Sequence, residues 1–194
     1  MAMELSEQVK DLIKKARIVD FSSWRPAHPP ESIARFQKAD DDRRYLTDDD
    51  FESITQLAPK MTSHVTIALL LRDQSAEIVD EARVQLLPQF PGILEPGGRL
   101  YPQMRADDCW RDFWHFLRCV TYGIAGGRRD YTSQLGMHYL ESLYGELQVP
   151  IAVMSQGLKE LKTASLNRLS ESDQVAIGPY FDHLILHLDH FDDD

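Results

Sequence analysis

A short run of reactive side chains stands out near the middle of the chain. Cys109, Arg111 and Asp112 lie within four positions of one another, and Arg105 comes four residues before the cysteine. On a helix, Cys109 and Asp112 would lie about 60° apart on the same side, because successive residues turn by about 100°. A thiol, a carboxylate and two guanidinium groups together suit covalent attachment of a ligand that carries N–H groups and carboxylate arms.

The same residues allow a simpler interpretation, in which a buried Cys109 lies beside a surface Arg111–Asp112 pair and binds nothing. Cys-x-Arg-Asp alone leaves this alternative open. Asp107 and Asp108 directly precede the cysteine and are expected to raise the pKa of its thiol by local repulsion.

Three histidines near the C-terminus form a second candidate site. His183, His187 and His190 are spaced i, i+4, i+7, which places them on one helical face, with Asp194 one turn further on. Such a face could chelate Zn²⁺ or Ni²⁺. Structural zinc sites usually draw on separate elements, however, and no cysteine lies nearby. A solvated polar face of the last helix is therefore the alternative.

The elements that would position these groups are predicted to be helices. The segment 104–125 is the most apolar and aromatic part of the chain, and it ends at Gly126-Gly127, a pair suited to a left-handed C-cap. Strand patterns are weak throughout, so the predicted fold class is all-α, with about seven to nine helices around one core. Further helices are predicted over about 131–147 and 150–168, and from about Glu171 onward.

The first half of the chain is also predicted to be helical. Thr47 is a good N-cap, and the acidic residues 48–50 follow it where the helix dipole favours anions. Residues 63–87 are predicted to form one long amphipathic helix. The prolines and glycines of 90–101 end it.

Residues 1–31 are predicted to form an N-terminal helix and hinge, separate from a domain over 32–194. Three prolines within 22–32 exclude a continuous helix there and indicate the hinge. The helix, over 4–19, is short and must bury its apolar stripe to be stable. We expect it to dock on the body of the chain or on a neighbouring subunit. The stripe consists of Leu5, Val9, Leu12, Ile13 and Ala16.

Length and charge narrow the possible functions. The 194 residues suffice for one domain with a sizeable core. The formal net charge of −10 disfavours nucleic acid and anionic membranes as partners. No apolar run approaches the about 20 residues of a membrane span, so membrane insertion is not expected. Cys109 and Cys119 would be about 15 Å apart on one helix, too far for a disulfide, and a reducing, cytoplasmic setting is predicted.

Several motifs follow one another at the spacing of a known family. Seven residues separate the first two, and no gap is needed from there to Val149-Pro150. Over about residues 33–190 the chain therefore resembles a phycobiliprotein subunit of the allophycocyanin-like branch. The motifs are PGGRLY at 96–101, CWRD at 109–112, TYGIAGG at 121–127, ADDDRRYLT at 39–47 and GPYFD at 178–182.

The resemblance implies a globin-like helical fold in which two N-terminal helices pair subunits. It also implies a phycocyanobilin-like bilin, an open-chain tetrapyrrole, bound covalently through a cysteine thioether. Cys109 would be the attachment site, and Asp112 would accept hydrogen bonds from the inner pyrrole nitrogens. Arg111 would bind a propionate, and Arg105 matches an arginine that does so in β-type subunits.

The chain departs from the family pattern in several places. Arg99 replaces the asparagine of the turn, and His115 and Phe116 stand where a tyrosine pair is usual. Trp110 and Trp114 add bulk that could stack on a bilin or fill its space. Residues 1–31 have no counterpart in standard subunits. Since those subunits pair through the helices that follow, the extra helix is expected to change assembly or partner binding and to leave the pocket unaffected.

The residues and the resemblance together predict a pigment-binding phycobilisome protein for light harvesting or energy transfer. Nothing resembles a catalytic triad, a P-loop or a dinucleotide motif, so no enzyme is predicted. The implied partners are phycobiliprotein subunits or a second copy of the chain, and phycobilisome linker proteins, at the cytoplasmic (stromal) face of thylakoids. One alternative is a pigment-free interaction module in phycobilisome assembly, turnover or regulation. The other is a metal-binding protein that uses the C-terminal histidines.

Overall fold

The computed structural model describes residues 5–25 and 27–192, and over this part the fold is all-α. Within it, nine α-helices are joined by loops and short 3₁₀ turns, and an isolated β-bridge pairs Val19 with Thr132. The predicted class and the range of seven to nine helices are confirmed. None of the helices in these residues is both long and apolar enough to cross a membrane. The helices are α1 (Glu7–Lys15), α2 (Pro30–Asp41), α3 (Asp48–Leu57), α4 (Thr62–Asp73), α5 (Ser75–Leu86), α6 (Gln103–Ala125), α7 (Gln134–Leu147), α8 (Ile151–Leu166) and α9 (Glu171–Asp189).

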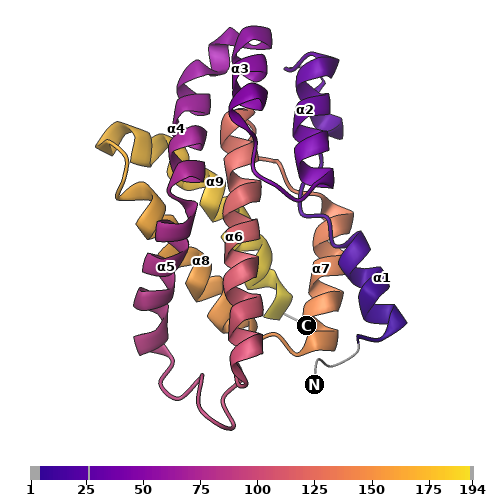
Figure 1. Ribbon diagram of the computed structural model, residues 1–194, viewed down its shortest axis with the longest axis vertical. Coiled ribbons are helices and arrows are strands. Elements are labelled where there is room, and N and C mark those ends of the chain that lie inside the picture. The colour runs from indigo at the N-terminus through magenta and orange to yellow at the C-terminus, as the bar shows by residue number, and fades with distance from the viewer. Residues whose placement is uncertain (1–4, 26, 193–194) are drawn as a thin grey trace.

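Helix α6 runs through the middle of the molecule, and the other helices surround it (Figure 1). It packs against α4, α5, α8 and α9. Every residue from Phe116 to Ala125 is buried, as expected of a helix whose surface is covered on all sides. The helix ends at Ala125 with Gly126 as its C-cap, and Gly127 adopts a φ of 61°. The predicted left-handed cap is therefore confirmed.

The single helix predicted over 63–87 is wrong, because the structure has two helices there. Helix α4 ends at Asp73 and α5 begins at Ser75, while Gln74 has φ −105° and ψ 16°. Helix α4 packs mainly on α6 and α5 mainly on α8, so the chain turns between them. Leu71 and Ile78 are both fully buried, which keeps the apolar pattern continuous through the break and hides it in the sequence.

The predicted N-cap of α3 is confirmed as a capping box. The Thr47 hydroxyl accepts a hydrogen bond from the Asp50 amide at 3.2 Å, and the Asp50 carboxylate accepts one from the Thr47 amide at 3.0 Å. Arg44 donates to the same carboxylate at 2.6 Å. This junction fixes where α3 starts relative to the end of α2.

The N-terminal segment is packed against the body of the chain, and α1 lies against α7. This helix was expected to dock either on the body of its own chain or on a neighbouring subunit, and in the structure it docks on its own chain. The stretch predicted as a hinge also contacts the body, because Trp24 has no exposed surface and Phe21, just before the stretch, is buried. The Trp24 ring centroid lies 4.9 Å from that of Phe36, and His28 Nε2 is 2.7 Å from the Gly126 carbonyl oxygen. Prolines stop a helix but leave neighbouring aromatic side chains free to enter the core.

Replacing Trp24 with alanine is expected to lower the free energy of unfolding by about 3–5 kcal/mol, because a fully buried indole leaves a cavity. Urea denaturation followed by circular dichroism measures this change. Leu135→Ala is the control, since that side chain is 62% exposed, and it should change the free energy by less than about 0.5 kcal/mol. An unchanged unfolding midpoint for Trp24→Ala would contradict a core role for this segment.

Candidate functional site

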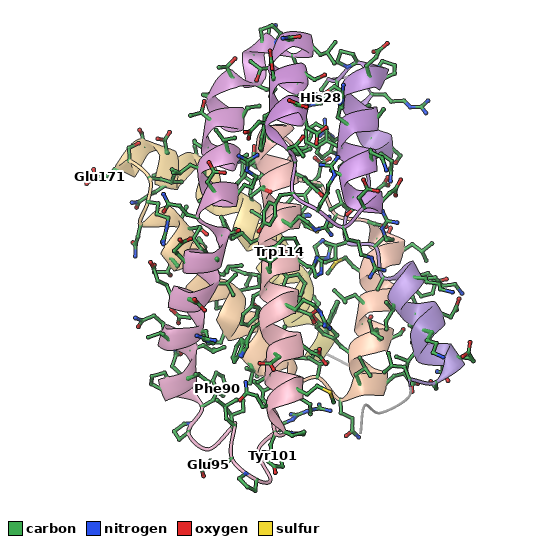
Figure 2. All side chains as sticks on the ribbon, in the orientation of Figure 1. His28, Phe90, Glu95, Tyr101, Trp114 and Glu171 are labelled. Atoms are coloured by element: carbon green, nitrogen blue, oxygen red, sulfur yellow. The ribbon has the colours of Figure 1, made fainter. Side chains whose placement is uncertain are left out.

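A cavity of about 490 Å³ opens beside the N-terminal half of α6, and α1 and α7 supply further wall residues. All four residues predicted from the sequence line it, namely Arg105, Cys109, Arg111 and Asp112. Figure 2 labels Tyr101 at the N-terminal end of α6 and Trp114 near its middle, and Cys109 and Asp112 lie between them along the helix. The volume falls within the range of small-molecule sites, about 300–1,000 Å³.

Cys109 is a free thiol that is 6% exposed, at the wall of this cavity. Burial raises the pKa of the thiol to about 12, with a further contribution from Asp112 and a smaller one from Asp108, while Arg105 opposes them. The expected rise is therefore present, but burial is its main cause, and of the two aspartates named for it only Asp108 contributes. Cys119, also free, is fully buried and is not part of the cavity wall.

Asp112 is a carboxylate with no cationic partner among the described residues. It accepts one hydrogen bond, from the Tyr144 hydroxyl at 2.8 Å, and burial raises its pKa to about 6. Arg111 pairs instead with Asp108, at 2.9 Å, so the surface Arg111–Asp112 pair of the simpler interpretation is not formed. A desolvated anion that faces a cavity is suited to a ligand with N–H donors or a positive charge.

The two arginines of the motif differ in how firmly they are held. Arg105 donates to the backbone carbonyls of Arg99, Leu147 and Gln148 at 3.0–3.1 Å, which fixes the turn before α6 and the end of α7. It also lines a second, more open hollow of about 770 Å³. The Arg111 side chain is 64% exposed, so it can reorient toward a ligand.

The far end of the cavity contains groups that the sequence analysis did not assign to a site. Arg17, Arg43 and Arg118 line it there together with His115. Burial lowers the pKa of His115 to about 4, with help from Arg118, so the ring is neutral at physiological pH. The spacing of His115, three residues after Asp112, could have indicated its position. No local signal marks Arg17 or Arg43, which come from other parts of the chain.

Trp110 and Trp114 are not among the described residues that line the cavity. The Trp110 ring packs on Phe113, with centroids 5.7 Å apart, and Trp114 packs on Tyr45 at 4.7 Å. One and five positions after Cys109, the two side chains turn away from the face that carries the thiol.

The expectation that the N-terminal extension leaves the pocket unaffected is also wrong. Ile13 of α1 lines the same cavity as Cys109, and so do Leu5, which precedes the helix, and Ala16, Arg17 and Ile18, which follow it. The apolar stripe of α1 faces inward because α1 lies along α7, whose residues form the adjoining wall.

The C-terminal histidines do not form a metal centre in the part of the chain that the structure describes. His183 Nε2 and His187 Nε2 lie 2.8 Å and 3.1 Å from the same Thr132 hydroxyl oxygen. His190 Nδ1 lies close to the Leu186 carbonyl oxygen, one turn back. Asp194, the fourth residue of the proposed set, lies outside the described residues.

Comparison with known proteins places most of the chain in one sequence family. The model of the family described as Phycobilisome protein matches residues 34–188. The allophycocyanin alpha-B chain of Synechococcus sp. is 35% identical over 148 residues, which cover 76% of this chain and 91% of that one. The alpha-B chain of Porphyra purpurea is 34% identical and the allophycocyanin alpha chain of Cyanophora paradoxa 33%, each over 147 residues and with the same coverage. The family match begins after α1 and Trp24 and contains the four predicted site residues.

Asp112→Asn is expected to stabilise the ligand-free protein at neutral pH by on the order of 3 kcal/mol. The pKa of Asp112 rises from 3.8 to about 6 on folding, so the folded protein retains a proton that the unfolded chain has released. The free energy of unfolding therefore falls as pH rises from about 4 to about 6, and the penalty is complete above that interval. Asparagine removes the charge and still accepts the Tyr144 hydrogen bond.

Denaturant unfolding of wild type and Asp112→Asn across pH 4–8 measures this difference. Asp108→Asn is the matched control, because that carboxylate is exposed and pairs only with Arg111. A stability difference between wild type and Asp112→Asn that stays constant across this range would contradict the raised pKa.

Proposed function

The chain belongs to the phycobilisome protein family, and we propose that it binds a bilin through a thioether to Cys109 for light harvesting or energy transfer. Members of this family are pigment proteins of light harvesting with a globin-like all-α fold, and not enzymes. The observation that carries the proposal is the cavity that joins a cysteine thiol to a carboxylate without a cation. That combination fits a ligand with N–H groups that is held by one covalent bond.

Asp112 would act on the inner nitrogens of the ligand. Its carboxylate would accept their N–H hydrogen bonds, which would relieve the desolvation that now raises its pKa. Its negative charge would in turn favour the protonated form of those nitrogens. Tyr144 keeps the carboxylate in place through its hydroxyl. The bilin itself would supply the conjugated system that absorbs light.

Arg105 and Arg111 would hold the carboxylate arms of the ligand. Arg111 is exposed and bound only to the exposed Asp108, so it can exchange that partner for a propionate at little energetic loss. Arg105 is bound to three carbonyl oxygens and has no carboxylate partner among the described residues, so it would add positive charge from a fixed position.

Attachment at Cys109 would be an addition without oxidation. The sulfur would bond to a carbon of an exocyclic double bond, and the thiol proton would end on the neighbouring carbon. At a thiol pKa of about 12 the thiolate is scarce at neutral pH, so uncatalysed addition is expected to be slow. We therefore expect attachment to require a separate lyase.

The binding partners that we propose for this chain are inferred from its relatives. Because these are allophycocyanin chains, we propose that this chain assembles with phycobiliprotein subunits or with a second copy of itself. Phycobilisome linker proteins and the cytoplasmic (stromal) face of the thylakoid complete the proposed setting.

One observation favours the alternative of a pigment-free interaction module in phycobilisome assembly, turnover or regulation. The Cys109 thiol is almost fully buried and has a raised pKa, which reduces its reactivity before any ligand arrives. A colourless protein that still binds antenna subunits would support this alternative.

Co-expression with bilin biosynthesis and a suitable lyase tests the proposal directly. We expect a covalent adduct, visible by zinc-induced fluorescence on a denaturing gel and located on Cys109 by mass spectrometry of tryptic peptides. Cys109→Ser should abolish the adduct, and Cys119→Ser, at a cysteine outside the cavity, should retain it. An adduct on Cys119, or none in the wild type, would reject covalent binding at Cys109.

In the pigmented protein, Asp112→Asn is expected to change the colour more than the yield of attached bilin. Loss of the anion should lower the pKa of the ligand nitrogens, so the absorption band should shift and weaken. Absorbance spectra normalised to the adduct on gels measure both quantities, with Asp108→Asn as the control that removes an exposed charge. An unchanged band would argue against contact between Asp112 and the ligand.

A further inference from the structure

We infer that the N-terminal helix α1 is part of the ligand site, and that Ile13 and Ala16 contact the part of the bilin that α6 and α7 leave uncovered. The inference rests on the proposed function and deepens it. It assigns ligand contacts to a segment that precedes the matched family region of 34–188.

The placement of α1 residues around the cavity is the first observation. Ile13 and Ala16 are half-buried, and both line the wall that also includes Cys109 and Asp112. Their remaining apolar surface faces a cavity and is available to an apolar conjugated ligand. The neighbouring Lys14 is exposed and is not part of the described wall.

The second observation is that α1 is anchored to the body of the chain. A helix that forms part of a cavity wall must be held in position. Val9 is buried, and Gln8 Nε2 donates to Glu146 on α7 at 2.9 Å. Lys15 Nζ lies 5.4 Å from the ring centroid of Tyr139, also on α7. Just after the helix, Arg17 pairs with Asp40, so α1 is tied to the body of the chain along its length and at its end.

A further contact, made by Arg43, joins α1 to another residue of the cavity wall. Arg43 Nη2 lies 3.4 Å from the Ile13 carbonyl oxygen, in the last turn of α1. The backbone φ of Arg43 is 52°. The side chain makes no ion pair with a described residue, so its positive charge remains beside the cavity and near the C-terminal end of α1. The dipole of α1 favours a cation at that end.

The consequence is that one chain encloses the ligand with its own extension. Water would be excluded from this side of the bilin without a neighbouring subunit, and twisting of the ligand would be restrained in the free chain. Removal of α1 would open the pocket and expose Cys109, which should lower the pKa of its thiol toward the ordinary value of about 8.5.

Thiol labelling of the ligand-free protein tests the wall without any pigment. We compare the rate at which N-ethylmaleimide modifies Cys109 in the full chain and in a variant that lacks residues 1–15. The truncated protein should react at least about tenfold faster, since one unit of thiol pKa changes the thiolate population tenfold. Cys119 should remain unmodified in both and reports whether the core is intact. Equal rates at Cys109 would overturn the inference.

A matched pair of substitutions keeps the test valid if the truncated chain does not fold. Ile13→Trp places a large side chain toward the cavity, and Lys14→Trp places the same side chain on the exposed face of α1. Ile13→Trp should slow maleimide labelling and reduce the yield of bilin adduct on co-expression by at least about tenfold, whereas Lys14→Trp should match the wild type in both.

The outcomes separate this inference from the proposed function. An adduct that forms in the wild type and equally in Ile13→Trp would overturn the role of α1 and leave bilin binding at Cys109 intact. A wild type that forms no adduct would overturn the proposed function and the assigned bilin contacts together, whatever the labelling rates.

Discussion

The buried carboxylate of Asp40 is the contact on which the arrangement of the site depends. It lies on α2 and accepts hydrogen bonds from Arg118 on α6, at 2.9 Å, and from Arg17 just after α1. The Asp40 and Arg118 side chains are only 4% and 7% exposed. Removing one partner of such a pair typically destabilises a protein by about 3–5 kcal/mol, because the other charge stays buried without compensation. Three segments far apart in the sequence are thereby held at one end of the cavity.

The hydrogen bonds of this contact continue into the core. Arg118 also donates to the Tyr122 hydroxyl at 2.8 Å, and that hydroxyl donates to the Arg44 carbonyl oxygen. Arg44 in turn binds Asp50 in the capping box of α3. The position of α6, and with it the direction of Cys109 and Asp112, is thus coupled to the junction between α2 and α3. The C-terminal half of helix α6 belongs to the core, and its N-terminal half forms part of the cavity wall. The same helix therefore carries both the packing of the core and the candidate site.

The features that the sequence predicted correctly are those that depend only on residues close together in the chain. Successive residues of a helix turn by a fixed angle, so the shared wall position of Cys109 and Asp112 followed from their spacing. The left-handed end of α6 followed from Gly127, because glycine accepts a positive φ without strain. The N-cap at Thr47 followed from the residue types at the start of the helix, although the reciprocal hydrogen bond from Asp50 was not predicted. These features require no knowledge of the remaining chain.

The features that were missed depend on contacts between distant segments. The break at Gln74 is invisible because Leu71 and Ile78 enter the core on either side of it. The burial of Trp24 depends on Phe36 and Gly126, and a side chain at Gly126 would meet the indole at about 2.2 Å. The inward face of α1 depends on α7. The alternative interpretation paired Arg111 with Asp112, but Arg111 pairs with Asp108, which lies one turn before it on the exposed helix surface.

The wall of the cavity contains polar groups whose pairing is incomplete. Elsewhere, buried acidic groups such as Asp40 and Asp50 have arginine partners. At the cavity, Asp112 has a hydroxyl partner only, and His115 Nδ1 is buried without a partner among the described residues. Trp24 Nε1 and Ser32 Oγ are also buried without a partner among the described residues, but they do not line the cavity. Buried polar groups are normally satisfied, so the incomplete pairing of a carboxylate and an imidazole in one cavity wall indicates a surface shaped for something other than stability. A ligand with N–H donors would correct the deficit at Asp112, and its binding energy would then stabilise the fold by linkage.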